Sequence, residues 1–109
     1  MKKILTVLFL FSFFTAVSHA VKVYPNPWIP ADNSGTHNGP IKFEGLPSGG
    51  GTIIIYNSTG ELVRTITWPT GSTTTWDAKN NLGENVASGV YIWVLTQGGR
   101  ENGKIVIVR

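Results

Sequence analysis

The stretch Trp76–Trp93, W-D-A-K-N-N-L-G-E-N-V-A-S-G-V-Y-I-W, decides which fold class the chain adopts. Its first part is rich in turn formers, namely Asp77, Asn80, Asn81, Gly83 and Gly89. The short side chains of aspartate and asparagine bond their own backbone, glycine accepts positive φ, and such turns need no ligand to form. The following run Val90–Leu95 is apolar without alternation, which is typical of a central strand covered on both faces. The stretch therefore predicts a strand end, two turns and a central strand.

Six other segments have the composition of short strands. They are residues 21–24, 41–44, 52–56, 62–68, 73–76 and 101–109. Turn signals separate them about every 8 to 12 residues, and no stretch shows a helical period. This pattern predicts an all-β fold, an immunoglobulin-like antiparallel β-sandwich of about seven strands. A small barrel is the alternative.

Two of these segments predict which side chains face the core. Alternation places Ile41 and Phe43 inward. In the segment 62–68 the period is uneven, because Leu62, Ile66 and Trp68 share one face while Val63 falls on the other. A β-bulge near Arg64 would reconcile the two sets. The last segment, Glu101–Arg109, is expected either to close a sheet or to offer an edge to a partner.

The segment after the first strand is expected to be a surface loop. Pro25 and Pro27 end the strand because proline cannot donate to a β-ladder. Residues 28–40 then contain the further turn signals Pro30, Gly35 and Gly39. His37 lies in this loop and is expected to be solvated rather than a metal ligand, since a metal site needs several partners.

The N-terminus has the three parts of a secretory signal peptide. Lys2 and Lys3 precede the apolar run Ile4–Val17, and Ser18–Ala20 supplies small residues for cleavage. The run is shorter than the roughly 20 residues of a comfortable membrane span. We therefore expect residues 1–20 to be a signal peptide, residues 21–109 to be one secreted or extracytoplasmic domain in the periplasm or at the cell surface, and no membrane span after cleavage. An uncleaved anchor is the alternative.

Composition excludes several classes of function. Nine basic residues, less Lys2 and Lys3, leave seven against six acidic residues, so the mature net charge is +1. Because the seven are scattered along the chain, no nucleic acid partner is expected. The absence of cysteine removes disulfides, thiol catalysis and sulfur-ligated metals.

A set of short motifs runs through the predicted domain. The motif residues are Tyr24, Pro25, Asn26, Pro27, Gly60, Trp76, Asp77, Gly83, Gly89 and Tyr91. With their neighbours they form V-Y-P-N-P, I-Y-N, G-E-L-V-R, W-D and S-G-V-Y, followed by G-K-I near the end. In these motifs the chain resembles the immunoglobulin-like domain of the flagellar hook-capping (FlgD-type) protein family. It is also similar to the C-terminal sorting domains, of type A, of proteins exported by the bacterial type IX secretion system.

The resemblance implies a β-sandwich used for surface assembly or attachment, without catalysis. Its implied partner is another envelope or surface protein. Two departures bear on the role. Hook-capping proteins carry an N-terminal docking segment, and none is expected here, whereas sorting domains end a large cargo protein and here a signal peptide leads straight into the domain. A type IX secretion sorting module is therefore the alternative function.

Carbohydrate binding is a third hypothesis, and enzymatic activity is not expected. Trp76 and Trp93 are expected in the core, which leaves Trp28 and Trp68 as candidates for stacking on a sugar ring. The carboxylates show no paired arrangement of the kind that glycosidases use. The spacing of the turn residues around Asp77 also fails the calcium-loop pattern. We expect no catalytic residue, no cofactor and no metal.

Overall fold

The computed structural model describes residues 20–30, 39–97 and 101–109. These residues form seven strands, and no helix occurs among them. The strands are β1 (Lys22–Tyr24), β2 (Ile41–Glu44), β3 (Gly51–Asn57), β4 (Leu62–Trp68), β5 (Thr73–Trp76), β6 (Gly89–Leu95) and β7 (Asn102–Ile107). The prediction of an all-β chain with about seven strands is confirmed.

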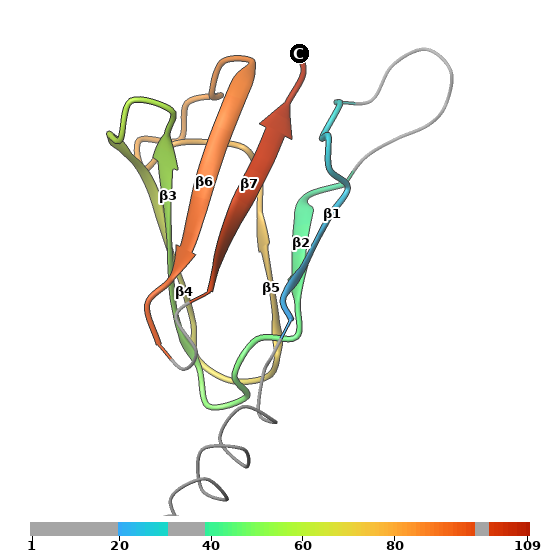
Figure 1. Ribbon diagram of the computed structural model, residues 1–109, viewed down its shortest axis with the longest axis vertical. Coiled ribbons are helices and arrows are strands. Elements are labelled where there is room, and N and C mark those ends of the chain that lie inside the picture. The colour runs from blue at the N-terminus through green and yellow to red at the C-terminus, as the bar shows by residue number, and fades with distance from the viewer. Residues whose placement is uncertain (1–19, 31–38, 98–100) are drawn as a thin grey trace, which may run out of the picture.

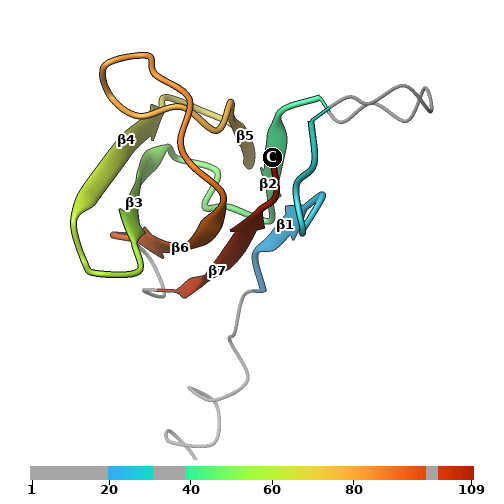
Figure 2. The ribbon, with the colours of Figure 1, turned by 90° about the horizontal axis from the view of Figure 1, so that it is seen from above.

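The strands form two antiparallel sheets that face each other. One sheet has the order β1-β2-β5 and the other the order β4-β3-β6-β7. Figure 1 shows β6 and β7 in one layer and β1, β2 and β5 in the other. Seen from above, the two layers enclose the core between them (Figure 2). The architecture is the predicted immunoglobulin-like sandwich.

The core is built from the inward-facing residues of both sheets. Its fully buried large side chains are Trp76, Phe43, Ile41, Ile53, Ile55, Leu95, Ile105 and Ile107. Aromatic rings join the sheets edge to face, with centroids 5.7 Å apart for Phe43 and Trp93 and 5.8 Å apart for Trp76 and Tyr91. The predicted core positions of Ile41, Phe43 and the two tryptophans are therefore confirmed. Such pairs add about 0.5–1.5 kcal/mol each beyond area burial.

A bulge in β4 explains its uneven pattern. The register of β3 with β4 passes from Ile55↔Arg64 to Tyr56↔Leu62, so Val63 is an extra residue. The bulge that would reconcile the two sets of residues is present beside Arg64. It also turns Leu62 outward, where the side chain is 56% exposed. The expectation that Leu62 shares a face with Ile66 and Trp68 is therefore wrong.

Strand β6 is central in its sheet, as predicted, but only one of its faces is covered. Tyr91, Trp93 and Leu95 are buried. The alternate residues are half-buried or, at Val90, 41% exposed. No second layer lies on the outer side of this sheet within the described ranges, so the expectation of a strand covered on both faces is wrong.

The chain after Pro27 begins with a buried residue rather than with a surface loop. Trp28 lies parallel to β7, where its backbone N–H donates to Val106 O at 2.8 Å and its carbonyl accepts from Val108 N at 2.9 Å. The loop prediction is therefore wrong at Trp28. The predictions for His37 and for the signal peptide up to residue 19 lie outside the described residues.

Candidate functional site

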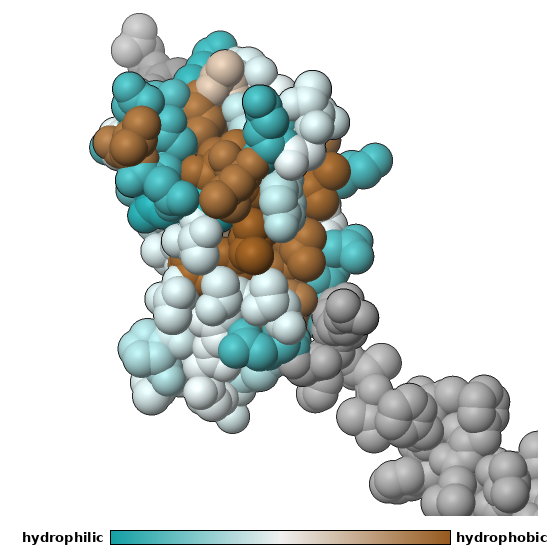
Figure 3. Space-filling model, turned by 90° about the vertical axis from the view of Figure 1, so that its left-hand side faces the viewer, coloured by the Kyte–Doolittle hydropathy of each residue, from teal (hydrophilic) through white to brown (hydrophobic). Residues whose placement is uncertain are grey.

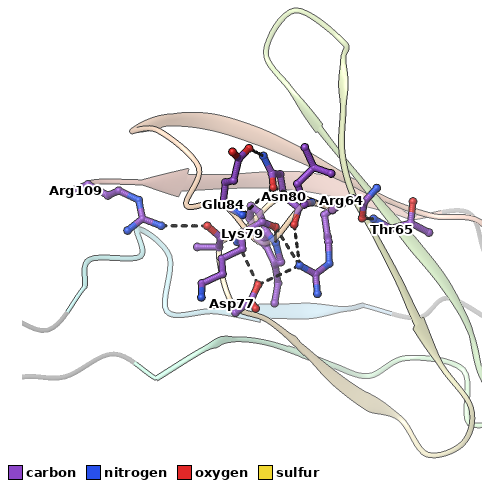
Figure 4. A network of polar contacts seen from close by, with 11 residues as sticks. Arg64, Thr65, Asp77, Lys79, Asn80, Glu84 and Arg109 are labelled. Atoms are coloured by element: carbon purple, nitrogen blue, oxygen red, sulfur yellow. Dashed lines mark hydrogen bonds and ion pairs between the residues drawn. The ribbon is translucent and has the colours of Figure 1, made fainter.

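The turn-rich loop after β5, residues 77–88, is held by an arginine from β4. Arg64 Nη1 donates to the carbonyls of Lys79 and Asn80 at 3.3 and 3.2 Å and lies 3.4 Å from Asp77 Oδ1 (Figure 4). Because Arg64 pairs with the buried Ile55 in the ladder, its side chain leaves β4 on the core side and reaches the loop. Its role is to tie the loop to the four-stranded sheet.

The loop also satisfies many of its own polar groups. Asn80 Oδ1 accepts from the backbone N–H groups of Leu82 and Glu84, both at 2.9 Å, and Asn80 Nδ2 donates to Glu84 Oε1 at 3.0 Å. Asp77 Oδ1 accepts from Lys79 N at 3.2 Å. These are the Asx-type bonds predicted from the turn formers. The polar atoms of the loop thus serve the backbone.

A second arginine holds the loop from the other side. Arg109 donates from Nε to Val86 O and from Nη2 to Ala78 O at 3.1 Å. Its backbone N–H donates to Ser88 Oγ at 2.8 Å, and its guanidinium carbon lies 5.1 Å from the Trp28 ring centroid. Sequence reasoning missed this role of Arg109 because the partners lie 21 to 31 residues away along the chain.

Asparagine side chains close both edges of the four-stranded sheet. At β7, Asn26 Nδ2 donates to Lys104 O at 2.9 Å and Asn26 Oδ1 accepts from Val106 N at 3.0 Å. At β4, Asn81 N donates to Val63 O at 3.0 Å and Asn81 Oδ1 accepts from Thr65 N at 3.1 Å. Each asparagine hydrogen-bonds backbone groups that a neighbouring strand would otherwise pair with. Another strand therefore cannot pair with the sheet at these positions.

The prolines of the Y-P-N-P motif flank the asparagine that caps β7. Tyr24 ends β1, and Pro25 and Pro27 bracket Asn26. Trp28 then continues the pairing with β7. The last strand is expected from the sequence either to close a sheet or to offer an edge to a partner. Along Lys104–Val108 its edge is covered by Asn26 and Trp28, so this part of the strand offers no free edge.

The two tryptophans that were candidates for stacking on a ligand both lie in the core. Trp28 is 8% exposed and Trp68 is 3% exposed. Their Nε1 atoms donate to the protein's own carbonyls, Trp28 to Gly39 O at 3.0 Å and Trp68 to Gly71 O at 3.0 Å. Neither ring offers a free face to a sugar, so the structure contradicts this candidate site.

Three motif glycines have positive φ. Gly60 and Gly83, at 89° and 82°, are in the left-handed region that favours glycine. Gly89 has φ 158°, which is close to extended backbone. The remaining motif residues, Trp76 and Tyr91, form the aromatic pair beneath the loop, and their polar atoms donate to Lys79 O at 2.8 Å and Ala87 O at 2.7 Å.

One small cluster of titratable groups lies on the outer side of the three-stranded sheet. The Tyr24 hydroxyl donates to Glu44 Oε2 at 2.7 Å, which lowers the pKa of Glu44 and raises the pKa of Tyr24. Lys42 Nζ lies 3.5 Å from the same oxygen. Within the described residues no three His, Cys, Asp or Glu side chains gather as metal ligands.

The outer side of the four-stranded sheet is apolar. We call it the outer apolar face and define it by Ile54, Tyr56, Leu62, Val90, Ile92, Val94 and Val106. Each alternates with a buried neighbour or pairs with one of the others across the ladder. Figure 3 shows a band of hydrophobic side chains bordered by polar ones. At one end Val94, Leu95, Thr96 and Asn102 line a shallow hollow. Sequence reasoning missed this face because it assigned β6 two covered sides.

The sequence model of the FlgD Ig-like domain matches residues 30–100, which is well over half of the 109 residues. The chain belongs to the FlgD Ig-like domain family. No curated protein matches the chain. The family resemblance inferred from the motifs is therefore confirmed, and it agrees with the two-sheet architecture.

Two solved structures from Porphyromonas gingivalis share this fold. PorZ, an essential bacterial surface component of the type IX secretion system, has a TM-score of 0.65 and 26% identity over 83% of this chain. Dimeric latent PorU has a TM-score of 0.55 and 20% identity over 84% of this chain, a likeness of fold alone. The matches cover 12% of PorZ and 10% of PorU, so this FlgD Ig-like domain is similar to a small part of each.

Within the described part of the chain, no helix has the length and apolar character needed to cross a membrane. The polar contacts described above for residues 77–88 end on backbone groups, on neighbouring side chains or on the two arginines, so these contacts hold the loop in place. The surface that stands out is the outer apolar face.

Proposed function

We propose that this FlgD Ig-like domain is a non-catalytic, extracytoplasmic module that attaches to another envelope or surface protein. The observation that carries the proposal is the likeness to PorZ, a surface component of a secretion system, over 83% of this chain. The hydrogen-bonded loop, and the satisfied buried polar side chains of residues 20–30, 39–97 and 101–109, support a scaffold rather than a reaction centre. No cofactor or metal is part of the proposal.

The edges of the four-stranded sheet bear on how the module attaches. Strand addition requires free N–H and C=O groups along an edge. Asn26 and Trp28 occupy these groups along Lys104–Val108 on the β7 edge, and Asn81 occupies Val63 O and Thr65 N on β4. Attachment through a face or a loop is therefore favoured over the addition of a strand.

The proposed location rests on the N-terminal segment that the sequence predicts to be a leader. We propose that residues 1–20 direct export and are removed, which leaves residues 21–109 as the functional domain in the periplasm or at the cell surface. Val21, the first residue of the proposed domain, donates from its backbone N–H to Glu101 Oε2 at 2.9 Å. After leader removal no membrane span is expected.

A capture experiment tests the proposed attachment. The exported, tagged protein is used as bait against the native envelope, with an excess of untagged protein as competitor and heat-unfolded protein as control. We expect one envelope protein to be retained, to be displaced by the competitor and to be absent from the control. Saturable quenching of tryptophan fluorescence by a polysaccharide, with no protein retained, would contradict the proposal in favour of carbohydrate binding.

A sorting role in type IX secretion is a second candidate function, favoured by the same likeness to PorZ. The domain is fused to the C-terminus of an exported passenger in a type IX-competent host and in a secretion-deficient mutant. A sorting module delivers the passenger to the surface only in the competent host. An attachment module gives equal passenger distribution in the two strains.

A further inference from the structure

The peptide bond that leader removal would break lies at the start of the folded domain. Ala20 and Val21 flank this bond, and β1 begins at the next residue, Lys22. Val21 is half-buried and packs against the core. A single residue therefore separates the bond from an ordered strand, so the backbone after the bond is free only when the strand is free.

Both polar atoms of the peptide group at this bond contact other parts of the domain. Its N–H, on Val21, donates to Glu101 Oε2 at 2.9 Å. Its carbonyl oxygen, on Ala20, lies against Gly45, where an added Cβ would come within 2.7 Å of it. A peptidase must place this oxygen in an oxyanion hole and protonate this nitrogen as it leaves. Ala20 as a whole is exposed, but these contacts compete with that chemistry.

Strand β1 fixes the chain that follows the bond. It pairs with β2 along its whole length, from Lys22↔Glu44 to Tyr24↔Lys42, and Val23 packs against the core. The Tyr24 hydroxyl also donates to Glu44 Oε2 at 2.7 Å. Burial and backbone hydrogen bonds of this kind protect a segment from proteolysis. The residues after the bond therefore have to leave β2 before a peptidase can bind them.

Release of β1 from β2 does not require the whole domain to unfold. β1 has three residues and is an edge strand, paired only with β2 in its sheet. Its end residues, Lys22 and Tyr24, are exposed. Short, exposed elements open at a lower free energy than the global unfolding of a domain. The rate of cleavage of a folded chain should then follow the population of this locally open state.

We infer that the domain shields its own leader bond: a leader peptidase cuts between Ala20 and Val21 only while β1 is undocked from β2, and docking closes the site. Shielding rests on the leader that forms part of the proposed function. The reaction is a hydrolysis, in which water adds its hydroxyl to the Ala20 carbonyl carbon and a proton to the Val21 nitrogen as the bond between them breaks. The new Val21 amine then docks beside Glu101.

Shielding makes the order of folding and cleavage decide the form of the protein. A chain that is cut before β1 docks is released as residues 21–109. A chain that folds first keeps its leader, and only three residues lie between Val17, the end of the apolar run, and Val21. This distance is roughly 14 Å even when the chain is fully extended. The folded domain then stays tethered beside the apolar run.

Cleavage of the full-length precursor by a purified leader peptidase in detergent tests the shielding. The unfolded reference is the full-length double variant Phe43→Asp with Trp76→Asp, which places two carboxylates in the core and leaves residues 1–24 unchanged. Circular dichroism checks which precursor is folded, and N-terminal sequencing identifies the bond that is cut. We expect the folded precursor to be cut after Ala20 at least about tenfold more slowly than the unfolded reference.

A pair of glycine substitutions separates local opening from global stability. Gly45 and Gly60 have nearly the same φ, 84° and 89°, so alanine strains the backbone similarly at both. At Gly45 the added methyl group meets Ala20 O, whereas at Gly60 no described residue beyond its chain neighbours comes within 4 Å of it. Gly45→Ala should therefore speed cleavage of the folded precursor roughly threefold or more, and Gly60→Ala should leave the rate within about twofold of the parent.

The possible failures of this experiment are distinguishable from one another. Equal cleavage rates for the folded precursor and the unfolded reference would overturn the shielding and leave the leader intact. Equal rates for Gly45→Ala and Gly60→Ala would overturn the local opening at β1. An unfolded reference that is not cut between Ala20 and Val21 would overturn the leader and the shielding together.

Discussion

At the scale of single residues, Trp76 joins the turn-rich loop to the core. Its side chain is 1% exposed, its ring lies edge to face with Tyr91, and its Nε1 donates to Lys79 O at 2.8 Å. One residue therefore fills the space between the sheets and fixes the start of the loop. Both contributions depend on the size of the indole and on its single donor.

Trp76→Ala is expected to lower the free energy of unfolding by about 3–5 kcal/mol, because it leaves a cavity and removes one of the two donors to Lys79 O. Urea unfolding followed by circular dichroism measures the loss. Leu82→Ala is the control from the same loop, since Leu82 is 82% exposed, and it should change stability by less than about 0.5 kcal/mol. Similar midpoints for the parent and Trp76→Ala would contradict the core role.

Tyr91 should make stability depend on alkaline pH. Burial raises the pKa of Tyr91, although the charge of Arg109 opposes the shift. The folded state thus keeps this proton to a higher pH than the unfolded state does. The stabilisation is complete below the ordinary pKa of 10.0 and is lost as pH rises through the raised value.

The free energy of unfolding of the parent protein should therefore fall from pH 10 upward. The free energy of unfolding of the Tyr91→Phe variant should fall less steeply over the same range. At pH 7 the variant should lose about 1 kcal/mol, because the hydroxyl no longer donates to Ala87 O. Urea unfolding at pH 7 to 11 provides the measurement. Parallel slopes for Tyr91→Phe and the parent would show that another group causes the alkaline loss.

At the scale of elements, the two asparagine caps define the limits of the four-stranded sheet. Asn26 uses both its donor and its acceptor on β7. Asn81 uses its backbone N–H and its side-chain oxygen on β4. The two caps therefore differ in whether the side-chain nitrogen takes part in closing the edge.

This difference predicts unequal effects of the same substitution. Asn26→Asp replaces the side-chain donor to Lys104 O with an anionic oxygen. It should lower the free energy of unfolding by roughly 1–2 kcal/mol. Asn81→Asp keeps the oxygen that accepts from Thr65 N and should stay within about 0.5 kcal/mol of the parent. Urea unfolding at pH 7 compares them, and equal losses would argue against the side-chain donor at β7.

The strands themselves were predictable because alternation and turn composition are local signals. The inward positions of Ile41 and Phe43 followed from neighbouring residues alone, whereas the uneven period of residues 62–68 left the bulge beside Arg64 open. Trp28 was assigned to a loop because its partner Val106 lies far along the chain, and the Asn26 cap spans 80 residues in the same way. The exposed side of β6 was missed because an apolar run does not reveal how many layers cover it.

At the scale of the whole molecule, the two outer sides of the sandwich differ in character. One is charged and hydrogen-bonded, and the other is the outer apolar face. The N-terminal boundary adds a further contact, since Val21 N donates to Glu101 Oε2 at 2.9 Å, next to the start of β7.

Leader removal after Ala20 should strengthen this contact. Cleavage turns the Val21 amide into an ammonium group beside the Glu101 carboxylate, and the neutral-donor bond becomes a charge-assisted one. N-terminal sequencing of the exported protein should find Val21 first. Glu101→Gln should then lower the free energy of unfolding of both forms. The loss should be about 0.5–1 kcal/mol larger for the processed protein than for the unprocessed one, as expected for a partly exposed ion pair. A sequence that begins at Met1 would contradict cleavage, and equal costs in the two forms would contradict the ion pair.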